Sequence, residues 1–168
     1  MINQLTYEQF SAEAASLMPK NAFMTTAHAG KTNTMTIGWG SVGIMWGKPV
    51  FTAMVRQSRY TKELVEASGE FTITLPLAEM KEALALCGSK SGRDLDKIAA
   101  AKLDLAAGQA IATPVINAPG LQLECKVVFK QTMEQQNLDA ANQTKWYANG
   151  DYHTLYFGEI IAAYKTGQ

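Results

Sequence analysis

The segment that most restricts the fold is the run from Leu121 to Lys130, in which apolar and polar side chains alternate. Successive side chains of a strand point to opposite faces, so this pattern predicts a β-strand with one buried face and one exposed face. Charged side chains would point outward. The side chains expected to point inward are Leu121, Leu123, Cys125, Val127 and Phe129.

Five further segments carry the β-branched and apolar residues that are typical of strands, and turn-forming residues separate them. Gly38, Gly40 and Gly43 predict bulges or a close approach of the backbone near one of them. The first two segments form a hairpin around a loop at 29–33. The five predicted strands span residues 22–28, 34–39, 50–54, 70–75 and 153–162.

Helical spacing of apolar residues is confined to short segments. Few short helices, combined with strands in hairpin order, favour an antiparallel β-barrel with peripheral helices over a parallel sheet. No repeat or linker is visible, so we expect residues 1–168 to form a single domain. Helices are predicted at 6–18, 62–67, 77–87 and, capped by Asp94, 95–103, with a loop at 105–120 and a short helix within the irregular segment 134–150.

The charges of the chain balance, because 15 Lys and Arg residues face 15 Asp and Glu residues. This argues against nucleic acid and anionic membranes as partners, since such binders need a basic field, but a small anion site needs only a few charges. Cys87 and Cys125 lack the spacing of a disulfide framework or metal site. There is no signal-peptide pattern and no apolar run of transmembrane length, so we expect a cytoplasmic protein without a metal.

Two arginines lie in the segment Val55–Thr61, where a strand is expected to lead into a helix. Thr61 is expected near the N-cap of that helix and Gly69 near its end. The first N–H groups of a helix lack internal partners and its dipole favours negative charge, so Arg56 and Arg59 would complete a phosphate site. A solvated basic turn is the alternative. The pattern does not separate the two, nor does it show which arginine would reach an anion.

Polar residues gather at three expected strand ends, at 33–36, 56–61 and 89–97. If they met at one rim of the barrel, they would offer hydroxyl and backbone N–H donors and fixed positive charge to a phosphorylated ligand. Met35, Trp39 and Tyr60 lie nearby in the sequence and could pack on a flat ring. These residues together predict a site for a phosphorylated aromatic cofactor.

Four segments resemble the flavin reductase-like proteins with the FMN-binding split barrel, and the flavoredoxin-like branch in particular. They occur in the order found in that family and span residues 21–160, nearly the whole chain. One such segment alone is not specific, whereas four in the right order are. The segments are Asn33–Trp39, Val55–Thr61, Cys87–Lys97 and His153–Ile160.

The resemblance implies that FMN binds at the interface of a homodimer. It assigns one set of residues to the FMN phosphate and a second set to the isoalloxazine ring, whose potential the strand at 33–36 would tune. The first set is Arg56, Ser58, Arg59, Tyr60 and Thr61, with Lys97 and the turn of Ser91 and Gly92 close by. The second set is Asn33, Thr34, Met35 and Thr36, with Trp39 beside them.

The function implied is that of an FMN-dependent oxidoreductase, either a flavin reductase or a flavoredoxin-like electron carrier. Hydride or electrons would pass through the flavin from NAD(P)H or a protein donor to an acceptor. No catalytic side chain is assigned, because the cofactor carries the difficult step. Two alternatives are a barrel that binds a flavin, another phosphorylated cofactor or haem without turnover, and an oligonucleotide-binding barrel, which the zero net charge disfavours.

Two features remain open at this level. His153 begins the fourth segment, and a position near the flavin and ordinary packing are equally compatible with the sequence. The segment from Gln131 to Tyr152 matches no motif of the family, in which such loops can shape access to the flavin.

Overall fold

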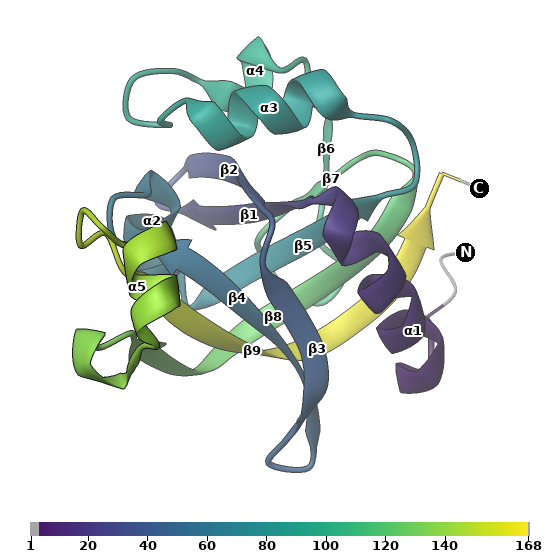
Figure 1. Ribbon diagram of the computed structural model, residues 1–168. Coiled ribbons are helices and arrows are strands. Elements are labelled where there is room, and N and C mark those ends of the chain that lie inside the picture. The colour runs from purple at the N-terminus through teal and green to yellow at the C-terminus, as the bar shows by residue number, and fades with distance from the viewer. Residues whose placement is uncertain (1–3, 168) are drawn as a thin grey trace.

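The computed structural model describes residues 4–167, and a seven-stranded antiparallel sheet dominates it (Figure 1). The strand order is β2-β1-β5-β8-β9-β4-β3, which confirms a mainly β, antiparallel fold. Within residues 4–167 no ladder joins the end strands β2 and β3, so the hydrogen bonds do not close the predicted barrel into a ring. The strands are β1 Ala22–His28, β2 Lys31–Ile37, β3 Gly40–Met45, β4 Lys48–Arg56, β5 Glu70–Pro76, β8 Gly120–Thr132 and β9 His153–Thr166.

The first hairpin is tighter than the sequence suggested. His28 pairs with Lys31, so only Ala29 and Gly30 form the turn, with φ of 49° and 77°. Positive φ at both central positions matches the twist of the flanking strands. The predicted loop at 29–33 is therefore wrong, and Asn33 lies within β2 opposite Thr26.

Close backbone approach explains two of the three glycines that the sequence singled out. A Cβ at Gly40 would lie 2.7 Å from the ring of Phe51, and one at Gly38 would lie 2.9 Å from Oδ1 of Asn21. A Cβ at Gly43 would meet open space, so no close approach requires that glycine.

Strand β8 departs from the predicted pattern, because Glu124 is fully buried and Phe129 is 45 % exposed. Two short strands interrupt the predicted loop, β6 Leu105–Ala106 and β7 Val115–Ile116. The backbone of the segment that contains them contacts the face of β8 that was expected to be exposed. Glu124 accepts hydrogen bonds from the backbone N–H groups of residues 109, 110 and 111 and from the hydroxyl of Tyr164. The register of β8 against β9 shifts after Glu124 and again before Phe129, which explains why the alternation of buried and exposed side chains fails beyond Glu124.

The helices lie around the sheet as expected, although two begin later than predicted. The third helix begins at Lys81 rather than 77, and the fourth at Lys97 rather than 95. Asp96, not Asp94, caps the fourth helix by accepting a hydrogen bond from the N–H of Ala99 at 3.1 Å. The helices are α1 Tyr7–Leu17, η1 Met18–Lys20, α2 Tyr60–Ser68, α3 Lys81–Ser89, α4 Lys97–Ala100, η2 Gln135–Asn137 and α5 Ala140–Trp146.

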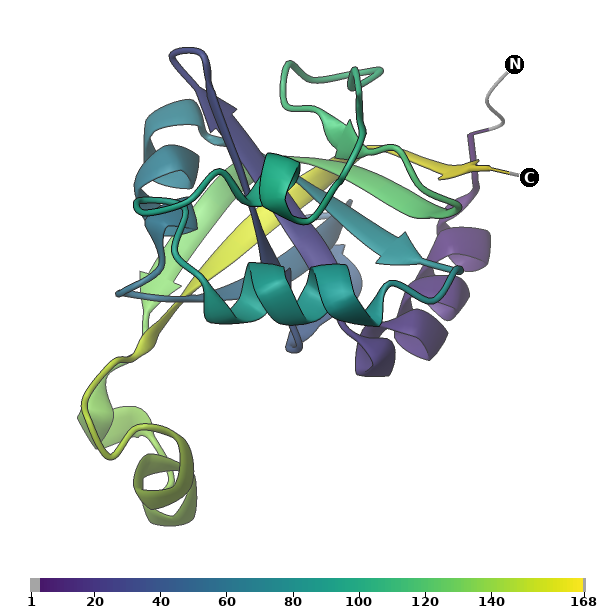
Figure 2. The ribbon, with the colours of Figure 1, turned by 90° about the horizontal axis from the view of Figure 1, so that it is seen from above.

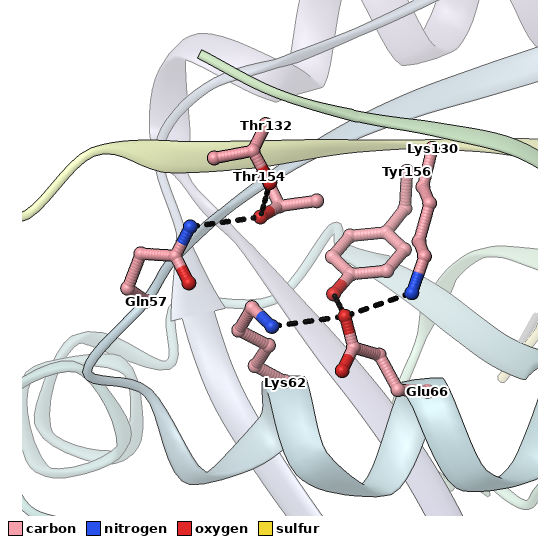
Figure 3. Close-up of polar contacts among 7 residues, drawn as sticks. All are labelled: Gln57, Lys62, Glu66, Lys130, Thr132, Thr154 and Tyr156. Carbon is pink, nitrogen blue, oxygen red and sulfur yellow. Dashed lines mark hydrogen bonds and ion pairs between the residues drawn. The ribbon is translucent and has the colours of Figure 1, made fainter. Parts of the chain in front are cut away.

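Figure 2 shows α3 and α4 covering one side of the sheet, while the segment that contains α5 extends away from it. Helix α2 is tied to β8 and β9 by a carboxylate cluster (Figure 3). Glu66 of α2 accepts hydrogen bonds from Lys62, Lys130 and Tyr156 at 2.9, 3.1 and 3.0 Å. The bond from Lys62, followed by those from the other two, lowers the pKa of Glu66 to about 2.

Substituting Glu124→Gln should lower the free energy of unfolding by about 3 kcal/mol. The amide NH₂ group would replace one carboxylate oxygen, so that buried donors would face each other where the wild-type protein has hydrogen bonds. Urea denaturation at neutral pH measures the change. The matched control is Glu66→Gln, whose partly exposed cluster should contribute about 1 kcal/mol or less. Equal losses in the two variants would contradict the role given to the buried carboxylate.

Candidate functional site

The three polar clusters identified in the sequence meet in the structure. A cavity of about 110 Å³ lies between the first turn of α2, strand β2 and the loop that joins α3 to α4. Hydroxyl groups and cations dominate its lining, as expected for an anion site. The lining residues are Met35, Ser58, Arg59, Tyr60, Thr61, Ser89, Lys90, Ser91, Gly92 and Lys97.

The turn between β4 and α2 brings these groups together. Arg59, not Thr61, is the N-cap residue of α2, with extended backbone angles of −74° and 131°. Thr61 lies in the first turn, where its Oγ1 accepts a hydrogen bond from Nδ2 of Asn33 at 2.7 Å. The first turn of α2 is therefore fixed to strand β2, and within that turn the N–H of Lys62 donates to the carbonyl of Arg59 at 3.0 Å.

Gly92 is required where the α3–α4 loop reaches the cavity. A Cβ there would overlap the side-chain amide of Asn33 and lie 2.9 Å from the ring of Tyr60. Any larger residue would push the loop away from β2 and α2. Ser91 stands beside it and accepts a hydrogen bond from the N–H of Arg93.

Two cations are anchored at the carboxyl end of α3. Lys97 is 4 % exposed and donates to the carbonyl of Cys87 at 3.1 Å, while Arg59 donates to the carbonyl of Gly88 at 2.8 Å. Neither side chain pairs with a carboxylate within residues 4–167. Burial is the main cause that lowers the pKa of Lys97 to about 8; Cys87 opposes this shift, and the charge of Arg59 contributes to it. A bound anion would stabilise the charged form of this ammonium group, which is buried without a carboxylate partner.

A second cavity of about 170 Å³ shares Met35 and Arg59 with the first. Its walls combine aromatic and thioether groups, which suit a flat ring, with the guanidinium groups of Arg56 and Arg59. The ring centroid of Trp39 lies 5.0 Å from that of Trp146 and 5.2 Å from that of His153. The lining residues are Met35, Thr36, Ile37, Gly38, Trp39, Met54, Arg56, Arg59, Trp146 and His153.

A larger hollow of about 590 Å³ continues from the second cavity, with which it shares Thr36. It lies between the β5–α3 connection, the first turns of α3, and residues 20 and 21. The hydroxyl of Thr36 donates to the carbonyl of Leu84 at 2.6 Å and so ties β2 to α3 at this junction. The cavities therefore form a series along β2.

The two arginines of the turn have different surroundings. Arg59 lines both cavities, whereas Arg56 lines only the second. The guanidinium of Arg56 donates to the backbone carbonyls of Asp151 and Trp146, and Ser58 donates through N–H and hydroxyl to the carboxylate of Asp151. The geometry thus favours Arg59 as the anion-binding arginine.

His153 lies in the wall of the second cavity and is 7 % exposed. Its Nδ1 shares a hydrogen bond of 2.7 Å with the hydroxyl of Tyr147. Burial, and then the positive charge of Arg56, lowers the pKa of His153 to about 4, so the imidazole is neutral at pH 7. A neutral ring is suited to packing beside an aromatic ligand.

Among the predicted site residues, Asn33 and Thr34 line neither cavity. Asn33 donates to Thr61 instead, and the hydroxyl of Thr34 accepts a hydrogen bond from Thr25 and donates to the carbonyl of Met24, so it joins β2 to β1. Sequence reasoning missed Met54 and Trp146. Met54 belongs to an apolar strand with no special signal, and Trp146 lies in the segment that matched no motif.

The described part of the chain lacks two kinds of feature. Residues 4–167 contain no helix with the length and apolar character needed to cross a membrane. They also bring no three His, Cys, Asp or Glu side chains together in a way that could hold a metal ion.

Replacing Lys97 by Met should raise the free energy of unfolding at pH 7 by about 2 kcal/mol, because the wild-type protein must bury an ammonium group. The unfolded chain keeps this proton up to about pH 10.5, whereas the folded chain keeps it only up to about pH 8. The free energy of unfolding of the wild-type protein therefore increases as the pH rises from 8 to 10.5. The advantage of the variant should therefore shrink from pH 8 toward pH 10. Urea titrations of both proteins measure it, and a destabilised variant at pH 7 would contradict the assignment.

The chain is similar to several known proteins. The model of the family described as "Flavin reductase like domain" matches residues 15–167. An uncharacterized protein of Archaeoglobus fulgidus is 28% identical over 145 residues, which are 86% of this chain and 72% of that protein. Flavoredoxin from Methanosarcina acetivorans has a TM-score of 0.68 and 28% identity, covering 88% of this chain and 69% of the other. An FMN-binding domain of a flavin reductase-like enzyme from Shewanella baltica has a TM-score of 0.70 and 21% identity, covering 98% and 77%. The chain belongs to the flavin reductase-like family.

Proposed function

We propose that this chain binds FMN and works as a flavin-dependent oxidoreductase, either as a flavin reductase or as a flavoredoxin-like electron carrier. The observation that carries the proposal is the unpaired, buried Lys97 beside Arg59 in a cavity lined with hydroxyl groups. The aromatic second cavity adjoins it through shared residues, in keeping with a ligand that joins a phosphate to a flat ring. The open antiparallel sheet is then the split barrel of the family, in a single cytoplasmic domain.

The residues fit this cofactor. Two cations and the first turn of α2 would hold the phosphate dianion, and Gly92 leaves room for the loop that surrounds it. The ring would lie along the wall formed by Met35, Thr36 and Trp39 and continue toward the larger hollow. The residues proposed for the phosphate are Arg59, Tyr60, Thr61, Ser91, Gly92 and Lys97.

Bound FMN would accept a hydride or two electrons and pass them on, so the protein has to bind, orient and tune it. Asn33 fixes the first turn of α2 through Thr61, and Thr36 fixes β2 against α3. The neutral His153 and the indole of Trp39 would offer uncharged flat surfaces to the ring, beside the guanidinium groups of Arg56 and Arg59. NAD(P)H or a protein is the proposed electron donor.

The proposal is tested by titrating the chain with FMN and following flavin fluorescence. The wild-type protein should quench it, and Arg59→Ala should weaken binding about 50-fold, since a charge-assisted contact to the phosphate is lost. Affinity of the wild-type protein should also fall above about pH 8, where Lys97 loses its proton. No quenching by the wild-type protein would refute FMN binding. A holoprotein whose flavin stays oxidised with NADH, NADPH and reduced ferredoxin would refute the oxidoreductase.

We also propose that two copies of the chain associate through the exposed face of β3, β4, β8 and β9. Trp46 is 64 % exposed at the tip of the β3–β4 hairpin, which extends beyond the body (Figure 1). It forms an aromatic cluster with Phe129 and Phe157, at centroid distances of 5.4 to 6.4 Å. Phe157 lies opposite Thr52, two residues from Met54 of the second cavity, so this face reaches the site.

Trp46→Asn should weaken self-association at least about 10-fold without loss of stability. Trp46 has a φ of 52°, a conformation that asparagine adopts more readily than tryptophan, so the turn itself should tolerate the change. Sedimentation equilibrium measures association, with Leu77→Asn, on a remote loop and 53 % exposed, as the control. A wild-type monomer, or equal association of wild type and Trp46→Asn, would refute this interface.

A further inference from the structure

The segment between β8 and β9 is held to the body mainly by the turn that precedes α2. The guanidinium of Arg56 donates to the carbonyls of Asp151 and Trp146 at 2.7 and 3.1 Å and lies 5.1 Å from the ring centroid of Tyr147. The N–H of Gln57 donates to the carbonyl of Tyr152, and Ser58 binds the carboxylate of Asp151. Three consecutive residues of the turn thus bind one return segment, 146–152.

These contacts determine where the indole of Trp146 lies. Trp146 ends α5, is 42 % exposed and forms an edge-to-face contact with Trp39. It lines the second cavity together with His153, whose partner Tyr147 lies under the guanidinium of Arg56. Without the arginine, nothing on the body would bind the carbonyl of Trp146 among the contacts found in residues 4–167.

We infer that Arg56 is a positioning residue, which holds Trp146 as one wall of the second cavity, and that Trp146 selects planar aromatic electron acceptors. The inference rests on the proposed flavin function and names the second substrate of the same site. An arginine is suited to this place because its planar fork can bind two carbonyls at once, whereas lysine offers a single ammonium group.

The chemical class of the acceptor follows from the groups that would remain beside a flavin ring lying along Met35, Thr36 and Trp39, above all the 42 % exposed Trp146. Trp39, Trp146 and a neutral imidazole present flat apolar surfaces, while Arg56 and Arg59 supply positive charge. No carboxylate is among the lining residues. The wall therefore favours an uncharged or anionic planar ring, such as a quinone. The quinone would take two electrons from reduced FMN and two protons from the flavin and solvent, leaving hydroquinone and oxidised FMN.

The positioning role is tested first without any turnover. Arg56→Ala should increase the rate of tryptic cleavage after Lys145 about 10-fold or more, because the return segment loses its anchor. It should also remove the near-ultraviolet circular dichroism signal of the Trp39–Trp146 pair, as Trp146→Ala does. Arg56→Lys should restore part of both. FMN affinity should fall less than in Arg59→Ala, because Arg56 lines only the second cavity and Arg59 lines both.

The selection of acceptors is tested with FMN-loaded protein reduced by dithionite and mixed anaerobically with menadione or ferricyanide. The half-saturating concentration of menadione should rise about 5-fold or more in both Trp146→Ala and Arg56→Ala, while the rate with ferricyanide, a one-electron acceptor that needs no ring site, stays unchanged. Unchanged menadione saturation in the two variants would overturn the acceptor selection.

The outcomes separate this inference from the proposed function. If Arg56→Ala weakens FMN binding as strongly as Arg59→Ala and leaves cleavage after Lys145 unchanged, Arg56 is a phosphate ligand and the positioning role is wrong. If the wild-type chain binds no FMN, both the proposed function and the acceptor selection are wrong. Cleavage and circular dichroism of the flavin-free protein still decide whether Arg56 positions Trp146.

Discussion

The carboxyl end of α3 and the two cations that bind it hold the proposed site together. Lys97 and Arg59 come from α4 and from the N-cap of α2, and they donate to the carbonyls of Cys87 and Gly88. Cations stabilise the carboxyl end of a helix through its dipole, but burying them without a carboxylate is costly. The arrangement therefore joins three segments at a cost in free energy and carries surplus positive charge. An anion at this place would compensate that charge.

The rest of the structure places this junction beside an aromatic cavity. Asn33 can bind Thr61 because the tight turn at Ala29 and Gly30 lets β2 begin early enough to include it. The close fit of Gly92 keeps the α3–α4 loop against the same two elements. On the other side, the turn before α2 binds the return segment that carries Trp146. One short strand-to-helix turn thus organises both the polar and the aromatic part of the site.

Local patterns predicted much of this arrangement. Alternation identified the strands, and the hydroxyls, cations and glycine of three short segments predicted a polar cluster, whose members the structure does bring together around one cavity. The predictions that failed did so because of contacts between residues that are distant in the sequence. Glu124 is buried because the segment around β6 and β7 covers its face, which the pattern of β8 alone does not show. Arg56 and Arg59 differ only in what they meet, namely the return segment and the end of α3. Trp146 has no local signal, since contacts from residues about ninety positions earlier place it.

The central claim is that the cavity beside Lys97 and Arg59 binds the phosphate of a flavin. Isothermal titration of the wild-type chain with FMN and with riboflavin tests it most directly, because the two ligands differ only in that phosphate. The account predicts that FMN binds at least about 100-fold more tightly, as two charge-assisted contacts imply. Equal affinity for the two flavins would contradict it.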